Sequence, residues 1–215
     1  MTPSGARGAV AGRRLALGVV HTVWRPRVLG AWRMPPAGPL ILAVNHTHNV
    51  DGPVLLGSSP RPVRFLVKRE AFVGPLGSFL RGIGQLSVAR GEIDLGAVRG
   101  ALRVLDEGEV LGVFPEGTRG QGDFASVRGG VAYFALRTGA PIQPVAVLGG
   151  AERASRLVPA LPPLRGRLDV VFGEPFTVAA PGGSRRGRAA LDEATTVIQR
   201  RLAAHLREAR HATGR

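Results

Sequence analysis

The feature that most limits the possible folds of this chain is a regular alternation of short apolar runs with longer amphipathic segments. The clearest run, residues 40–44, is Leu-Ile-Leu-Ala-Val, which is typical of a strand buried on both faces of a sheet. Other runs predict further strands at 63–67, 86–88, 110–114, 142–148 and 168–172. Helices are expected at 54–58, 70–81, 95–107, 128–138 and 188–210. This order predicts a single α/β domain with a central, largely parallel sheet flanked by helices.

The first 33 residues differ from the rest of the chain in their charge. They hold six arginines and no acid, since the first acidic residue is Asp51. We expect an N-terminal amphipathic helix within residues 8–29, with Pro26 ending the helical pattern. Apolar residues such as Leu15 and Trp24 lie among the arginines. This pattern suits a helix that lies in a membrane interface, and it suits equally a helix packed on the domain.

Composition narrows the possible partners without choosing one. The formal net charge of +14 suits a polyanion, whether nucleic acid or anionic lipid. Aromatic residues make up only 5% of the chain, which is little for a base-stacking surface. The chain has no cysteine, so disulfides, thiolate metal sites and a cysteine nucleophile are excluded. The longest early apolar run, residues 15–20, is far shorter than the roughly 20 residues that a spanning helix needs.

A polar cluster directly follows the strand predicted at 40–44, where α/β folds usually place their chemistry. Within it, His46 is a candidate general base, because an imidazole can take a proton at neutral pH. Asp51, five residues later, can fold back to fix the tautomer of that ring if the chain turns into a helix between them. His48 is a rival base, because on a helix it shares a face with Asp51.

A second polar cluster, residues 116–119, follows another predicted strand. Its Arg119 presents a rigid fork that suits a phosphate group, and Gly117 lets the backbone approach a ligand closely. Two further cations follow the ends of other predicted strands: Arg90 and Lys68, the single lysine of the chain. The alternative for any one arginine is an ordinary solvent-exposed side chain.

Other kinds of site fit the sequence poorly. His46, His48 and Asp51 do not have the spacing of the nearest metal-hydrolase pattern, so no metal is expected. The chain contains no Gly-x-Ser-x-Gly nucleophile elbow. It has no Walker loop, and the pair Gly82 and Gly84 lacks the third glycine of a dinucleotide site.

Four strings occur along the chain in a characteristic order: Asn45-His46-x4-Asp51, Gly84-Gln85-Leu86-Ser87-Val88-Ala89-Arg90, Phe114-Pro115-Glu116-Gly117-Thr118-Arg119 and Ala140-Pro141-Ile142-Gln143-Pro144-Val145. Together they resemble the four motif blocks of the 1-acylglycerol-3-phosphate O-acyltransferase family, the glycerophospholipid acyltransferases. The resemblance covers roughly residues 30–175. Its most specific part is the string that begins at Phe114, combined with the upstream histidine and aspartate.

The resemblance implies roles for the matching residues. His46 is expected to deprotonate the acceptor hydroxyl, and Asp51 to orient the ring and balance its charge. The acceptor-binding residues implied by the match are Lys68, Arg90, Glu116, Gly117, Thr118, Arg119 and Pro144. The family usually carries a small residue two positions after the histidine, and His48 departs from that pattern.

Within the acceptor site, the resemblance places Arg119 on the phosphate, with Arg90 and Lys68 also near it and Pro144 in an apolar wall. It implies transfer of a fatty-acyl chain from acyl-CoA or acyl carrier protein to a lysophosphatidic-acid-type acceptor. No covalent acyl-enzyme, cofactor or metal is expected. The expected location is peripheral, on an anionic membrane at the cytoplasmic face, with no nucleic-acid partner. The alternative function is a non-catalytic basic module that binds anionic membrane or nucleic acid.

These expectations divide the chain into three parts. Residues 1–33 are expected to form the membrane-contact segment, 34–184 the acyltransferase domain and 185–215 a C-terminal amphipathic helix. The sheet is expected to begin at about Leu40, so the fold beyond residue 38 is expected to survive removal of the N-terminal segment.

Overall fold

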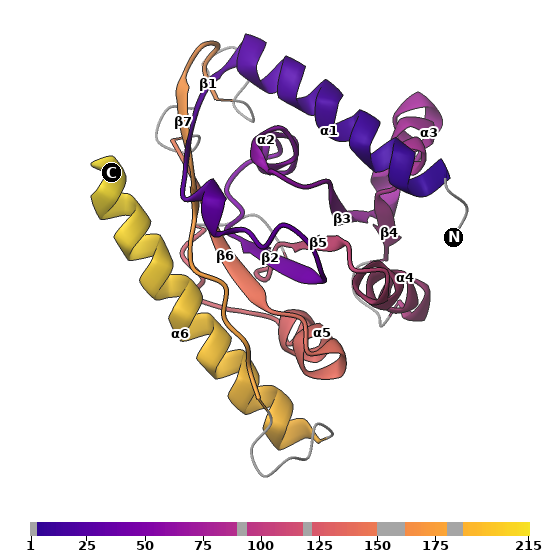
Figure 1. Cartoon of the computed structure of the whole chain (residues 1–215), viewed down its shortest axis with the longest axis vertical. Coiled ribbons are helices and arrows are strands. Elements are labelled where there is room, and N and C mark those ends of the chain that lie inside the picture. The colour runs from indigo at the N-terminus through magenta and orange to yellow at the C-terminus, as the bar shows by residue number, and fades with distance from the viewer. Residues whose placement is uncertain (1–3, 90–93, 118–121, 150–161, 180–186) are drawn as a thin grey trace.

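The structure, a computed structural model, describes residues 4–89, 94–117, 122–149, 162–179 and 187–215. These residues form a seven-stranded sheet in the order β1-β7-β6-β2-β5-β3-β4, with helices on both faces (Figure 1). The strands are β1 (Arg25–Leu29), β2 (Leu40–Val44), β3 (Val63–Lys68), β4 (Leu86–Val88), β5 (Val110–Val113), β6 (Ile142–Leu148) and β7 (Arg167–Phe172). The predicted α/β fold is confirmed.

The strand directions give the sheet two unequal parts. β2 is parallel to β5 and β6, and β3 is parallel to β4 and β5, so these five strands share one direction. β7 is antiparallel to β6, and β1 is parallel to β7. The sheet is therefore largely parallel, with two strands at one end that run in the opposite direction.

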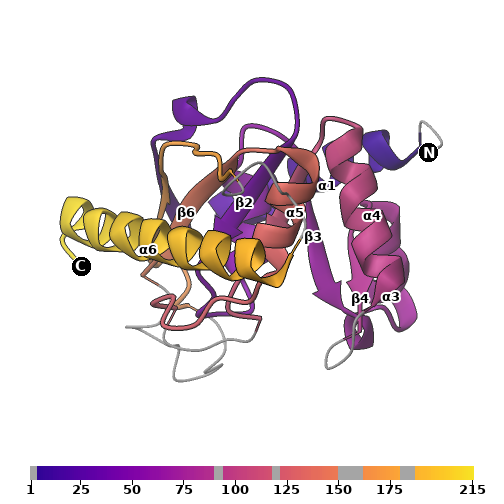
Figure 2. The same ribbon diagram turned by 90° about the horizontal axis from the view of Figure 1, so that it is seen from below.

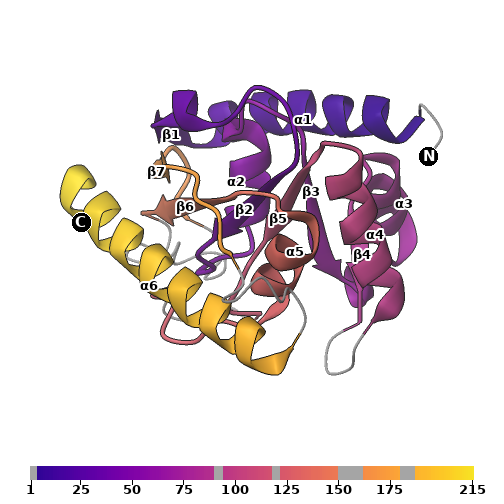
Figure 3. The ribbon, with the colours of Figure 1, turned by 60° about the horizontal axis from the view of Figure 1, so that its bottom comes forward.

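Helices cover the sheet in two layers. They are α1 (Ser4–Val23), α2 (Asp51–Ser58), α3 (Gly74–Gly82), α4 (Leu95–Asp106), α5 (Gly130–Thr138) and α6 (Arg188–Thr213). Figures 1 and 3 show α1 and α2 on one face and α4, α5 and α6 on the other, with α3 at the β4 end of the sheet. None of the helices in the described residues is both long enough and apolar enough to cross a bilayer.

The central strand β2 explains why the core has two halves. All five of its residues are buried, as its uninterrupted apolar run predicts. Leu40, Leu42 and Val44 pack in the half of the core that includes α2, because side chains alternate between the two faces of a strand. Ile41 and Ala43 pack in the other half, beneath α4, α5 and α6.

The helix expected within residues 8–29 is wrong at its C-terminal end. α1 stops at Val23, and Arg25–Leu29 form β1, which pairs with β7. Pro26 cannot continue a helix, but an edge strand tolerates proline because only one side of the strand is paired. The sheet therefore begins at Arg25 and not at about Leu40.

Two other helices also differ from the expectation. α2 begins at Asp51 rather than at residue 54, so the carboxylate lies at the positive end of the helix. The helix expected at 70–81 is a short 3-10 turn, Arg69–Ala71, followed by α3. Phe72 and Val73 separate the two, and α3 begins at Gly74, whose φ of 59° departs from helical geometry. The boundaries predicted at residues 33 and 184 stay predictions, and the second falls outside the described residues.

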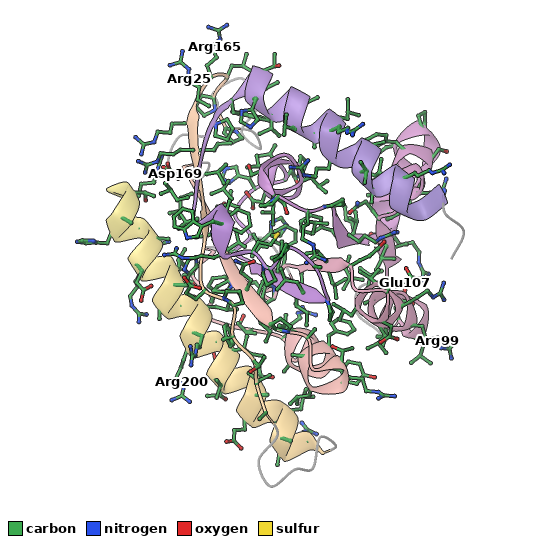
Figure 4. All side chains as sticks on the ribbon, viewed as in Figure 1. Arg25, Arg99, Glu107, Arg165, Asp169 and Arg200 are labelled. Carbon is green, nitrogen blue, oxygen red and sulfur yellow. The ribbon has the colours of Figure 1, made fainter. Side chains whose placement is uncertain are left out.

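One buried carboxylate joins β1, β7 and the C-terminal end of the chain. Asp169 on β7 is fully buried and pairs with Arg27 at 2.6 Å, Arg167 at 3.2 Å and Arg215 at 2.9 Å. Figure 4 shows Asp169 on β7 and places Arg25 and Arg165 at the outer end of the same strands. Burial acts to raise the pKa of Asp169, but hydrogen bonds from the three arginines outweigh it and lower that pKa.

Candidate active site

The parallel strands bring the predicted site to one edge of the sheet. β2, β3, β4 and β5 all end at this edge, because they share one direction. His46 follows β2, Lys68 is the last residue of β3, and Glu116 follows β5. Figure 2 shows the ends of β3 and β4 pointing the same way, beside α3. The topology therefore places these three predicted site residues at the carboxyl ends of parallel strands.

His46 and Asp51 form the centre of the site. Nδ1 of His46 lies 3.0 Å from Oδ2 of Asp51, whose carboxylate is 2% exposed. The same oxygen accepts the backbone N–H groups of Thr47 at 2.8 Å and His48 at 2.7 Å. Because a carboxylate only accepts, the proton of the neutral imidazole belongs on Nδ1. Nε2 of His46 is thereby left unprotonated and able to take a proton from a substrate.

An aromatic pair holds the plane of the His46 ring. The ring stacks on Phe114 with centroids 4.1 Å apart and an angle of 25° between the planes. Phe114 in turn stacks on Phe65, with centroids 5.4 Å apart. The His46 side chain is 13% exposed, so it is confined by its neighbours and still accessible. Stacking and the bond to Asp51 together restrict both the tilt and the rotation of the base.

Asn45 fixes the backbone immediately before the base. Its side chain is buried and exchanges two hydrogen bonds with Val147 on β6: Nδ2 donates to the carbonyl at 3.0 Å, and Oδ1 accepts the N–H at 2.7 Å. The amide thus extends the pairing of β2 with β6 past the end of β2. Sequence reasoning gave Asn45 no role. Its signals in the sequence were its place at the end of an apolar run and at the head of the first motif string.

Glu116 connects the turn after β5 to the base. Its Oε1 accepts a long hydrogen bond of 3.4 Å from the backbone N–H of His46. Burial raises the pKa of Glu116, and the negative charge of Asp123 raises it further, while the His46 N–H opposes the shift. Burial makes the ionised form of this carboxylate less favourable. A carboxylate with a perturbed pKa beside a candidate base is typical of a functional position.

Three of the predicted site residues, Arg90, Thr118 and Arg119, lie outside the described residues. Lys68 is exposed at the end of β3. Pro144 pairs with Ala43 in the sheet and lines a cavity of about 550 Å³ together with His205 of α6. Because α6 covers the face opposite α2, the structure does not bring Pro144 to the side of the sheet that carries Asp51.

His48 has a different position from the one expected. It precedes α2, which begins at Asp51, so it does not share a helical face with that carboxylate. Its backbone N–H donates to Asp51, whereas its ring is buried, with an Nδ1 that has no hydrogen-bond partner among the described residues. The ring contact to Asp51 therefore belongs to His46. Among all the residues that the structure describes, no group of three or more His, Cys, Asp or Glu side chains is arranged to hold a metal ion.

A doubly covered, largely parallel sheet carries an Asp-oriented histidine at its carboxyl edge, with a Phe-Pro-Glu-Gly turn beside it. This arrangement agrees with the α/β acyltransferases that the motif strings resemble. The family described as Acyltransferase matches residues 25–148, and the chain belongs to that family. This membership confirms the resemblance inferred from the four motif strings. It also favours an enzyme over the non-catalytic basic module.

Two relatives show the extent of the similarity. The chain is 29% identical over 152 residues to the 1-acyl-sn-glycerol-3-phosphate acyltransferase of Bacillus subtilis (strain 168). The aligned region covers 70% of this chain and 73% of that protein. It also matches the crystal structure of the 1-acyl-sn-glycerophosphate (LPA) acyltransferase PlsC from Thermotoga maritima, with a TM-score of 0.63 and 23% identity. That match covers 92% of this chain and 78% of the other, and shows that the two share a fold.

Proposed function

We propose that this acyltransferase moves a fatty-acyl chain from a thioester donor to the free hydroxyl of a 1-acylglycerol 3-phosphate, as a step of phospholipid synthesis. The donor is acyl-CoA or acyl carrier protein. The Bacillus subtilis relative is a 1-acyl-sn-glycerol-3-phosphate acyltransferase, which supports this choice of acceptor. The observation that carries the proposal is the 3.0 Å contact between His46 Nδ1 and Asp51, because it leaves Nε2 of His46 as a base.

The reaction follows from this geometry. Nε2 of His46 takes the proton of the acceptor hydroxyl while the hydroxyl oxygen attacks the carbonyl carbon of the thioester. The carbon–sulfur bond then breaks, and the departing thiolate receives the proton from the imidazolium. Asp51 stabilises the imidazolium while it exists. The ester forms in one transfer between two substrates, so the protein carries no acyl group covalently.

The acceptor occupies the turns that surround His46. Glu116 lies beside the base, and Gly117, Thr118 and Arg119 follow it in the sequence. In this proposal these residues bind the acceptor, with the Arg119 fork on the phosphate. Arg90 and Lys68 add positive charge at the ends of β4 and β3. Arginine suits this task because its planar fork matches two phosphate oxygens at once.

The acceptor and product are lipids, so the proposal includes peripheral docking on an anionic membrane at the cytoplasmic face. Two helices present apolar side chains to solvent. On α1 these are Val10, Leu15, Leu17 and Val19, and on α3 and at its start they are Val73, Leu76 and Phe79. α1 also exposes Arg7 and Arg14, and α3 exposes Arg81. Apolar side chains interspersed with arginines favour the interface of an anionic bilayer.

Thiol release tests the reaction directly. The protein is mixed with acyl-CoA, or with acyl carrier protein that bears the same chain, and with 1-acylglycerol 3-phosphate in mixed micelles. We expect thiol to appear together with the diacyl product, in equal amounts, and only when the acceptor is present. The His46→Ala variant is the control for acyl transfer that does not use the site.

Two results would contradict the proposal. Absence of thiol release with both donors and with a panel of lysophospholipid and glycerol 3-phosphate acceptors would leave the protein as a binding module. Equal rates with and without acceptor would show thioester hydrolysis rather than acyl transfer.

A further inference from the structure

The side chain of Arg128 lies across the backbone of Gly117, in the turn next to the base. A Cβ atom built on Gly117 would lie 2.7 Å from Cδ and 2.9 Å from Cζ of Arg128, and it would overlap Nε. Gly117 also has a φ of 71°, in the region that favours glycine. The guanidinium group of Arg128 thus occupies space that is open only because residue 117 has no side chain.

The backbone fixes this arrangement. The N–H of Arg128 donates to the carbonyl of Pro115 at 2.9 Å, and the N–H of Gly117 donates to the carbonyl of Phe114 at 3.0 Å. The same short turn carries Glu116, whose carboxylate contacts the backbone of His46. The backbone of Arg128 is therefore hydrogen-bonded to the active-site turn, although Arg128 lies eleven residues further along the chain than Gly117.

Arg128 is exposed to solvent, and among the residues that the structure describes no carboxylate pairs with it. Arg27, Arg33 and Arg64 each pair with a carboxylate. Within the described ranges, the guanidinium group of Arg128 forms no ion pair and donates no hydrogen bond. The planar donor fork of Arg128 lies over Gly117, next to Glu116 in the chain, and has no anion among the described residues. Such a fork is suited to an anion that arrives with the substrate.

We infer that Arg128 binds the phosphate group of the acceptor and so contributes to the choice of a phosphorylated acceptor. This inference rests on the proposed function. In a 1-acylglycerol 3-phosphate, the free hydroxyl and the phosphate are on adjacent carbon atoms, so a hydroxyl at His46 Nε2 brings the phosphate close to the base. The turn from Glu116 to Gly117 borders the base, and Arg128 supplies the cation that covers that turn.

The test compares two acceptors that differ only in the phosphate: 1-acylglycerol 3-phosphate and the matching 1-acylglycerol. In Arg128→Ala we expect KM for the phosphorylated acceptor to rise about 10- to 100-fold, with kcat little changed, as expected for the loss of hydrogen bonds to a charged group. KM for the 1-acylglycerol should stay within about threefold of the wild-type value. Arg128→Lys should recover part of the loss, since it keeps the charge without the fork.

Arg137→Ala is the matched control, because Arg137 is an exposed arginine on the following helix α5. It should leave both acceptors unaffected. Thermal unfolding of each variant shows that the fold is intact. A second donor, an acyl-N-acetylcysteamine thioester, carries no phosphate. A rise in KM that persists with this donor is therefore due to the phosphate of the acceptor and not to a phosphate of the donor.

The outcomes separate the inference from the function on which it rests. If the wild-type protein transfers acyl groups and Arg128→Ala weakens both acceptors equally, the inference is wrong and the function stands. If the defect disappears with the phosphate-free donor, Arg128 binds the donor and the inference is likewise wrong. If the wild-type protein itself transfers no acyl group, the proposed function fails first.

Discussion

At the scale of single residues, the carboxylate of Asp51 organises the loop between β2 and α2. One of its oxygen atoms receives the His46 ring and the backbone N–H groups of Thr47 and His48. The bonds that orient the base are therefore the bonds that shape its loop. Any substitution of Asp51 is expected to disturb both at once, so Asp51 is a poor choice for isolating the role of the base.

The base itself is tested by comparing two histidines. His46→Ala should lower kcat/KM by at least the ~10²–10⁴-fold that is usual for loss of a general base, because its Nε2 takes the hydroxyl proton. His48→Ala should lose far less activity, because its ring makes no contact with Asp51 in the described structure. Steady-state kinetics of the two variants, with thermal unfolding as the check on folding, decide the matter. The reverse order of activities would reassign the base to His48.

Glu116 allows function to be separated from stability. We expect Glu116→Gln to lower activity and to leave the folded state as stable as the wild type, or more stable, near neutral pH. The reason is that burial raises the pKa of Glu116, so ionisation of this group opposes folding. The difference in the free energy of unfolding should be absent in acid, where the wild-type carboxyl is protonated. It should grow as the pH rises through the pKa of Glu116.

Chemical denaturation of both proteins across this pH range measures the effect. A Glu116→Gln variant that is less stable than the wild type at every pH would mean that the carboxylate supports the turn. In that case the variant's loss of activity would be explained by a disturbed turn rather than by the missing charge.

The contacts of the site could be predicted where they join residues close together in the sequence, and could not be predicted where they join distant residues. His46 and Asp51 are five residues apart, so a turn into a helix can join them, and the structure shows that turn. Asn45 bonds to Val147, 102 residues away, and no pattern in the sequence marks that contact. The position of Pro144 is likewise set by the register of β6 against β2.

At the scale of elements, α1 combines the two alternatives that the sequence left open. Ala9 and Val20 are buried, so one face packs on the domain. Leu15 and Val19 are exposed on the other face, where a membrane can reach them. Removal of residues 1–33 would also remove β1, so that truncation is no longer a clean test of membrane binding.

Point substitutions give a sharper test. Leu15→Glu with Val19→Glu on α1, and Leu76→Glu with Phe79→Glu on α3, should each weaken binding to anionic vesicles by about tenfold or more, since each removes apolar area from the interface. Binding of the wild type should also weaken with salt, because exposed arginines act over about a Debye length. Co-sedimentation across a salt series measures both effects.

Tyr133→Glu is the matched control, because Tyr133 is an exposed apolar residue on α5, which covers the opposite face of the sheet. It should bind vesicles like the wild type. Equal binding by all the variants would mean that α1 and α3 do not contact the membrane. Loss in the α1 pair alone would restrict the contact to the N-terminal helix.

The strands show why the sequence predicted some elements and missed β1. β2 is buried on both sides, so its apolar run is unbroken. β1 pairs only with β7, and its sequence Arg-Pro-Arg-Val-Leu has neither an apolar run nor strict alternation. Its place depends on Asp169, which binds Arg27 from a position 142 residues further along the chain.

At the scale of the whole molecule, Asp169 is expected to dominate the response to acid. Its pKa is held low by three arginines, so its contribution to stability is fully present above the usual pKa of an aspartate and is lost as the pH falls through the lowered value. Asp169→Asn should cost roughly 1.5–3 kcal/mol near neutral pH, because it removes the buried anion that accepts charged hydrogen bonds from Arg27, Arg167 and Arg215, which are themselves partly exposed to solvent. Its stability should also fall less steeply in acid.

Unfolding in denaturant at a series of pH values tests this. Asp192→Asn is the control, because Asp192 forms only an exposed pair with Arg188, at 3.9 Å. That change should cost less than about 0.5 kcal/mol. If Asp169→Asn followed the same acid profile as the wild type, the acid sensitivity would have to come from other carboxylates.

The two outermost strands of the sheet also determine how the molecule behaves among its own copies. An open strand edge can template a growing fibre, a risk that rises when proteins crowd onto a two-dimensional surface. β1 offers Pro26, which has no N–H to donate, between Arg25 and Arg27, whose charges repel an identical edge. β4 is only three residues long. The described sheet is therefore poorly suited to edge-to-edge polymerisation, even at a high local concentration of the protein.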